Sequence, residues 1–245
     1  IVAGYEASYG GAALSCTPSV WAHHWSLSGA VPAPMLDGVL VGSYAGGYSQ
    51  VGEWHCRFGD NPGHMGTMGQ TVHELGHDIG WPDLYDVDGS SYGVGYYSIM
   101  ANGSWRRTAG YAGSLPSHPD AFLKWYQGWL TPEQIVGTRT DVQLRQVETN
   151  PHVIQLLGNP NGVDWLFGAH SGLGEYFLLE NRQPVGYDAG LPGCGILIWH
   201  IDETRPSSNS ANADDSRRLV DLEEADGRND LDRKVNYGDT GDYYV

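Results

Sequence analysis

The chain has 245 residues, of which 29 are Asp or Glu and 13 are Lys or Arg, so its formal net charge is −16. Nucleic acids and anionic membrane surfaces bind clustered positive charge, yet residues 1–100 carry one basic side chain, Arg57, against nine acids. The composition therefore argues against a nucleic-acid partner, and no apolar run approaches the roughly 20 residues of a membrane span. A hydrophobic share of 40% permits a sizeable core and argues against disorder.

Short strands and loops are predicted for residues 1–62, where Ile1–Ala3 and Val39–Val41 are β-like pieces separated by Gly and Pro. The three cysteines are too few for a disulfide-dense scaffold but allow one pair. We favour Cys16–Cys56, which leaves Cys194 as an odd thiol.

A helix is predicted over Thr67–Gly80, because Val72, Leu75 and Ile79 recur at three- and four-residue steps. Gly80, with a proline two residues later, is typical of a helix end. Residues 81–114 are rich in Gly, Tyr, Asp and Ser and are expected to form an irregular but ordered region.

A second helix is predicted over Pro119–Trp129, with its apolar residues on one face. These residues are Ala121, Phe122, Trp125 and Trp129. Four strands joined by Gly, Asn and Pro turns are predicted beyond Pro132. They are Val142–Val147, Val153–Leu157, Tyr176–Asn181 and Ile196–Ile201. The prediction is an α+β protein with a mixed part over residues 1–135 and a β-rich region over residues 136–245.

The segment His73-Glu74-Leu75-Gly76-His77 carries the chemistry. Two His at i and i+4 lie one turn apart on the same helix face, so both imidazoles can reach one metal ion. Glu74 follows the first ligand, at the position of a general base that holds and deprotonates a zinc-bound water.

The third ligand is predicted to be Asp83, six residues after His77. A turn at Gly80 swings the chain back, so that a side chain three residues later reaches the same metal. Asp78 lies next to His77. Its carboxylate is expected either to accept a hydrogen bond in the shell around the metal ligands or to lie on the exposed surface of the helix.

The segment His73–Asp86 resembles the active-site segment of the immune-inhibitor-A type metallopeptidases, secreted bacterial zinc enzymes of the metzincin clan. Four other segments resemble parts of the same family in the same order. They are Trp21–Trp25, Tyr97–Trp105, Tyr176–Gln183 and Gly195–Glu203.

The resemblance implies that His73, His77 and Asp83 bind zinc, that Glu74 is the general base and acid, and that Met100 supports the site from a methionine turn. Some metzincins place a Tyr two residues after this Met to stabilise the tetrahedral intermediate. That position is Asn102 here, so the role is unassigned. Tyr97 and Tyr111 are the alternatives, and a structural role is favoured for both.

Calcium is a weaker expectation. Asp86-Val-Asp88-Gly89 resembles the opening of a calcium loop but lacks the full twelve-residue pattern, so a turn capped by Asp side chains is the alternative. The acidic tail over residues 223–242 is a second place where calcium or a solvated acidic surface is expected.

The resemblance also implies a secreted protein made with a prosegment, acting on protein or peptide substrates. Family members usually have further strands before the segment matched by Ile1–Ser8, so we expect a fragment, a processed form or an unusually short member. The predicted function is a zinc-dependent endopeptidase.

Two alternatives to this function stay open. One is a non-catalytic zinc- or calcium-binding module with a β-rich recognition domain. Structural zinc sites usually have four protein ligands, whereas only three suggest themselves here. The other is a thermolysin-like site with Glu133 as the third ligand, which Gly80, Asp83 and Met100 argue against.

Overall fold

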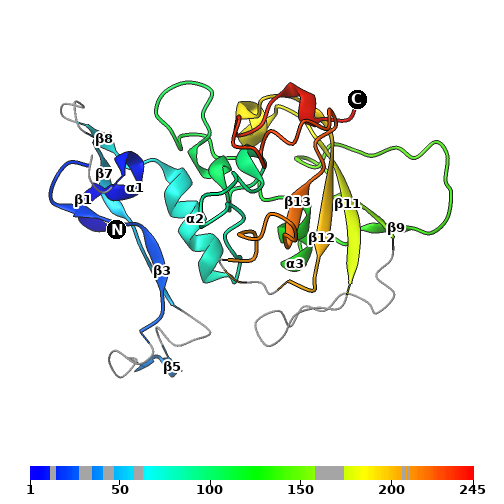
Figure 1. Cartoon of the computed structure of the whole chain (residues 1–245). Helices are drawn as coiled ribbons and strands as arrows, with labels where there is room; N and C mark the ends of the chain where they lie inside the picture. The colour runs from blue at the N-terminus through cyan, green and yellow to red at the C-terminus, as the bar shows by residue number, and fades with distance from the viewer. Residues whose placement is uncertain are drawn as a thin grey trace. The chain divides into compact units, whose positions relative to one another are not determined.

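The computed structural model describes residues 1–11, 15–27, 35–40, 47–57, 63–157, 174–205, 208 and 210–245. It divides into two compact units, Ile1–Trp81 and Pro82–Val245. Strands and a few helices make up both units (Figure 1), which confirms the expected mixed α+β class. Within the described residues, no helix is both long and apolar enough to cross a membrane. The predicted division into functional parts near residue 135 stays a prediction.

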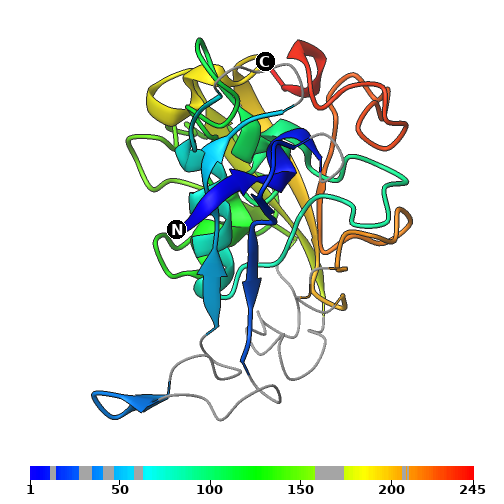
Figure 2. The ribbon, with the colours of Figure 1, turned by 90° about the vertical axis from the view of Figure 1, so that its left-hand side faces the viewer.

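The first unit is built on a four-stranded sheet in the order β2-β1-β7-β8. Its strand β1 pairs in parallel with β2 and β7, and β7 pairs antiparallel with β8. Two further antiparallel pairs are β3 with β6 and β4 with β5; the strands run in blue to cyan in Figure 2. The bounds are β1 Val2–Glu6, β2 Ser19–Val20, β3 His23–Trp25, β4 Met35–Leu36, β5 Val39–Leu40, β6 Tyr48–Gln50, β7 Gly52–His55 and β8 His64–Met65. Of the expected piece Val39–Val41, Val41 lies outside the described residues.

The buried carboxylate of Glu6 joins the strands of this sheet to the chain around them. Glu6, at the end of β1, precedes the one-turn helix α1 (Ala7–Gly10). Its Oε1 accepts the Ala22 backbone N–H at 2.9 Å, and its Oε2 accepts that of Gly52 at 2.7 Å. A Cβ on Gly52 would lie 2.6 Å from Glu6 N, so glycine is required for this approach. The Cys16–Cys56 disulfide is present, as predicted, and Cys194 is an exposed free thiol.

Helix α2 (Met68–Asp78) confirms the predicted helix to within two residues at either end. It ends where Gly80 takes a φ of 93° and the N–H of Trp81 donates to the Gly76 carbonyl at 3.0 Å. The buried face, however, is not the apolar one, because Leu75 is 51% exposed. The buried residues of α2 are Gly69, Gln70, His73, Glu74 and Gly76. Buried polar side chains need hydrogen-bond or metal partners, so this face is not an ordinary apolar packing face.

The second unit contains a five-stranded sheet in the order β13-β12-β11-β10-β9. All neighbours are antiparallel except β9 and β10, which are parallel. The bounds are β9 Glu133–Ile135, β10 Ile154–Leu156, β11 Glu175–Arg182, β12 Gly195–Asp202 and β13 Val220–Leu222. Three of the four predicted strands are therefore confirmed. The prediction of a strand over Val142–Val147 is wrong, because only one isolated bridge, Gln146 to Asn181, forms there.

The second predicted helix is shorter than expected. Helix α3 (Ala121–Tyr126) begins after Asp120, whose Oδ1 accepts the N–H of Leu123 at 3.1 Å, and Trp129 lies beyond the helix and is 57% exposed. The region 81–114 is irregular and ordered, as predicted, with two short 3-10 helices. These are η1 (Gly95–Tyr97) and η2 (Asn102–Trp105). Two others follow, η3 (Gly186–Gly190) and η4 (Thr240–Asp242).

A buried ionic network joins α3 to the sheet of the second unit. The ammonium of Lys124 on α3 lies 2.9 Å from Glu180 Oε2 on β11. The other oxygen of Glu180 accepts from Arg182 Nη1 at 2.9 Å and from Trp199 Nε1 at 3.1 Å on β12. Burial would raise the pKa of Glu180, but these cations outweigh burial and lower it, so the carboxyl stays ionised inside the core.

Candidate metal centre

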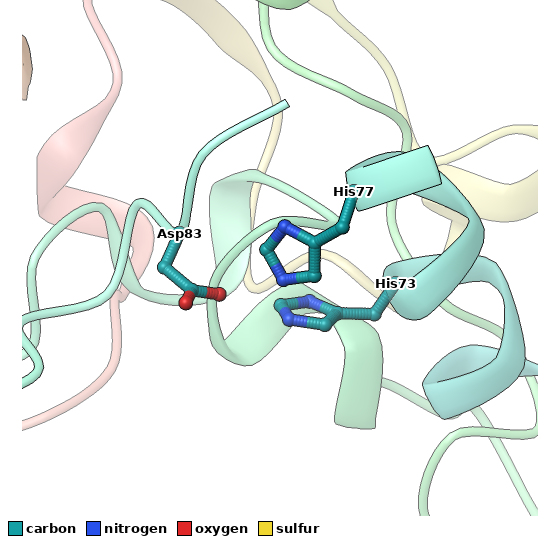
Figure 3. Close-up of side chains that lie close together, drawn as sticks. All are labelled: His73, His77 and Asp83. Carbon is teal, nitrogen blue, oxygen red and sulfur yellow. The ribbon is translucent and has the colours of Figure 1, made fainter. Parts of the chain in front are cut away.

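Three predicted ligands come together around one point. His73 and His77 lie one turn apart on α2, and the carboxylate of Asp83 faces their imidazoles (Figure 3). One ligand atom from each residue lies within 4.8 Å of the other two. Two imidazole nitrogens and one carboxylate oxygen at this spacing are donor atoms of the kind that zinc accepts.

The turn that ends α2 also orients His77. The Nδ1 of His77 lies 2.7 Å from the Trp81 carbonyl, which can only accept, so Nδ1 carries the proton. The lone pair is then on Nε2, the nitrogen left for a metal, in the tautomer that ligating histidines adopt. The left-handed conformation of Gly80 makes this return of the chain possible.

Asp83 is carried by a backbone that is held next to Met100. The Leu84 N–H donates to the Met100 carbonyl at 2.8 Å, and the Leu84 carbonyl accepts from Val94 at 3.1 Å. A Cβ on Gly93 would lie 2.2 Å from that carbonyl oxygen, so the position needs glycine. Asp83 and Met100 are both buried. The segment of Met100 thus fixes the backbone next to the third candidate ligand.

Glu74 is also buried, at 3% exposure, and its side chain and backbone have separate partners. The amide Nε2 of Gln70, one turn earlier on α2, donates to Glu74 Oε1 at 2.5 Å. The hydroxyl of Ser49 on β6 donates to the Glu74 carbonyl at 3.0 Å. The Glu74 carboxylate is therefore held by a hydrogen bond and largely shielded from water.

Asp78 has two partners in the first unit. Its Oδ1 lies 2.8 Å from His24 Nδ1 on β3, and its Oδ2 accepts from Ser49 Oγ on β6 at 2.9 Å. The His24 ring centroid lies 6.1 Å from that of His77. Asp78 thus ties the end of α2 to the β3–β6 pair. Its carboxylate is therefore hydrogen-bonded on both oxygens.

Of the two places named for calcium, the Asp86–Asp88 turn does not form a group of three possible ligands in the described part of the chain. Asp86 accepts hydrogen bonds from the N–H groups of Asp88 and Ser91 and from the Ser90 hydroxyl, which is the pattern of a capped turn. Burial would raise the pKa of Asp86, but these hydrogen bonds lower it to about 2. Among the described residues, neither Asp belongs to a group of three possible ligands, whereas Glu224, Asp226 and Asp242 of the tail form one.

Two of the residues considered from the sequence for other roles are Tyr97, for stabilising the tetrahedral intermediate, and Glu133, as the third ligand. Tyr97 is buried and donates to Asp242 Oδ2 at 2.6 Å, so it is structural. Glu133 lies on β9, where it pairs with Arg139 at 2.6 Å and His152 at 3.3 Å. The group that holds His73 and His77 contains Asp83 as its third member.

No role was assigned from the sequence to three residues that contact the helix of the site: Gln70, Ser49 and His24, the last of which was named only as part of Trp21–Trp25. Gln70 lies three residues before His73, so the ligand-bearing face of the helix could have pointed to it. His24 and Ser49 are 54 and 29 residues from Asp78, and no local pattern connects them to α2.

Comparison with known proteins assigns the chain to a family. Residues 1–130, a little over half of the chain, match the family described as "Immune inhibitor A peptidase M6, catalytic domain". A pre-pro-metalloprotease, PrtV of Vibrio cholerae serotype O1, is 36% identical over 96 residues, which are 37% of this chain and 10% of that protein. Immune inhibitor A of Bacillus thuringiensis subsp. alesti is 31% identical over 109 residues, 43% of this chain and 15% of that protein. The matched part thus spans between a tenth and a sixth of these relatives.

Proposed function

Because the chain belongs to the immune inhibitor A peptidase M6 family, we propose that it is a zinc-dependent endopeptidase with His73, His77 and Asp83 as the zinc ligands. The observation that carries this proposal is the grouping of these three donors on and just after a helix whose buried face is polar. Three protein ligands with a free fourth position are typical of catalytic zinc, whereas structural zinc usually has four.

Bound zinc would supply Lewis acidity, which lowers the pKa of water and polarises a peptide carbonyl. Glu74 then takes the proton of the attacking water and delivers it to the leaving amine as the peptide bond breaks. Its position directly after His73, its burial and its fixed orientation favour this role. A dry surrounding also strengthens the interaction of the carboxylate with a proton donor.

The supporting roles follow from the contacts. We assign Met100 to the floor of the site, because its carbonyl holds the backbone next to Asp83. We assign Asp78 to the support of α2 through His24 and Ser49. Calcium at Asp86 and Asp88 stays a prediction, which neither the family description nor the relatives' names support.

The substrate is proposed to be a protein or peptide, and the protein is proposed to be secreted after removal of a prosegment. The family description and the name "pre-pro-metalloprotease" of the Vibrio relative support both statements. Residues 1–135 would carry the peptidase chemistry, and residues 136–245 would form the β-rich region that follows it.

Metal analysis combined with casein digestion tests this function. The natural full-length protein should contain about one zinc, lose casein digestion when a chelator removes it, and regain digestion when zinc returns. Zinc binding without any digestion would favour the non-catalytic module instead. Digestion that continues in metal-free protein would overturn the proposal.

A further inference from the structure

We propose that Gln70 is a positioning residue for Glu74: its amide holds one carboxylate oxygen, so that the other faces the attacking water. This inference rests on the proposed peptidase function. It adds a residue that contacts neither the metal nor the substrate but fixes the orientation of the Glu74 carboxylate, which is the general base.

The contact itself is short and protected. Gln70 Nε2 lies 2.5 Å from Glu74 Oε1, and the side chains belong to residues that are 8% and 3% exposed. A hydrogen bond to an ionised carboxylate is stronger than one between neutral groups, and burial removes the competition of bulk water. The amide group must present its NH₂ to the carboxylate, because its oxygen would repel it.

The helix places Gln70 on the correct side for this role. Residues at i and i+4 lie above one another on one face, so Gln70 approaches Glu74 from the N-terminal side of α2. His77 lies on the C-terminal side of Glu74, three residues later. The Gln70 amide therefore reaches the Glu74 carboxylate from the direction along the helix opposite to that of His77, the second ligand.

The backbone of Glu74 is fixed independently by Ser49, whose hydroxyl donates to its carbonyl. The Gln70 amide acts on the side chain, because it restrains the three side-chain torsions of Glu74. A general base must lie within hydrogen-bond reach of its proton, and a misplacement of about 1 Å costs roughly 100-fold in rate. Removal of the Gln70 donor should therefore lower kcat more than it changes KM.

The test compares Gln70→Met with Gln70→Asn in the natural full-length protein. Methionine keeps the length of the side chain without a donor, and asparagine keeps the amide but shortens its reach. Thr71→Val, at the next position of α2, is the matched control. We expect kcat for a peptide substrate to fall roughly 10- to 100-fold in both Gln70 variants, with KM within about threefold and unchanged zinc content and Tm.

A second readout does not depend on turnover. A peptide hydroxamate chelates zinc and donates its hydroxyl proton to the neighbouring carboxylate, so its Kd reports the orientation of Glu74. Gln70→Met should weaken hydroxamate binding by about fivefold in the wild-type background and less than about twofold in a Glu74→Ala background, because the two residues act through one contact.

Three outcomes separate the possibilities. If Gln70→Met keeps the wild-type kcat while Glu74→Ala is inactive, the positioning role is wrong and the peptidase proposal stands. Equal weakening of hydroxamate binding in both backgrounds would also overturn the positioning role. If Glu74→Ala itself keeps full activity, the proposed function fails and the inference fails with it.

Discussion

Arg182 and Asp188 form a bidentate ion pair in which neither side chain is exposed. Arg182 Nε lies 2.6 Å from Asp188 Oδ2, and Nη2 lies 2.7 Å from Oδ1. The same Oδ1 accepts the His118 backbone N–H at 2.9 Å. The pair therefore ties β11 to η3 and to the segment before α3.

Loss of Arg182 should destabilise the protein strongly. Arg182→Met leaves Asp188 as a buried acid without its cation and Glu180 with Lys124 in place of two cations, and the loss of one partner of a buried ion pair costs about 3–5 kcal/mol of unfolding free energy. Urea denaturation measures this change. The control Arg233→Met removes an exposed arginine from the same unit and should stay within about 0.5 kcal/mol of the wild type. Equal stability of the two variants would contradict the account.

The ion pair also predicts how stability responds to acid. Burial alone would raise the pKa of Asp188, but the charge of Arg182 lowers it from 3.8 to about 2. Between these values the unfolded chain binds more protons than the folded one, so this contribution is complete above about pH 4 and is lost towards pH 2. Urea midpoints measured between pH 2 and pH 5 should fall less steeply with acid in Asp188→Asn. A slope equal to that of the wild type would show that the pair does not titrate as described.

The disulfide should stabilise the unit that carries α2. Cys16 and Cys56 are 40 residues apart, and the loss of a cross-link across such a loop costs about 4 kcal/mol in the chain-entropy model. The double variant Cys16→Ser/Cys56→Ser should therefore unfold at a lower temperature by calorimetry. Cys194→Ser, which changes an exposed free thiol, should leave the transition in place.

Gly80 should matter for zinc binding beyond its effect on stability. Alanine at a φ of 93° is strained by about 1–2 kcal/mol, and relief of that strain would move the turn between His77 and Asp83. Gly80→Ala should therefore weaken zinc binding in a chelator competition. Gly110→Ala, at a φ of 79° in the second unit, should carry a similar strain without changing zinc affinity. If both variants weaken zinc binding equally, the turn at Gly80 does not position the ligands.

Much of the site could be predicted from the sequence because its parts are local. His73, His77 and Asp83 lie within eleven residues, and helix periodicity plus one glycine turn is enough to bring them together. The support behind them could not be predicted. His24 and Ser49 reach Asp78 only because β3 pairs with β6, a long-range contact that no local pattern records.

The fold shows the same difference between local and long-range information. The long strands β11 and β12 are predicted by their own apolar runs. Strands β9 and β13 have only three residues each and form because a neighbouring strand pairs with them. Val142–Val147 has the residues of a strand but makes only one bridge. In α2 the apolar periodicity predicts the helix correctly, yet the buried face is the polar one. That face contains residues of the candidate site rather than of the apolar core.

The most direct test of the central claim is Glu74→Ala, measured for zinc content and casein hydrolysis together. The account predicts that zinc remains bound at about one per chain while hydrolysis falls by at least about 1,000-fold, because the ligands are intact and the general base is gone. Glu53→Ala, which removes an exposed glutamate from β7, should match the wild type in both measurements. Hydrolysis by Glu74→Ala at close to the wild-type rate would contradict the account.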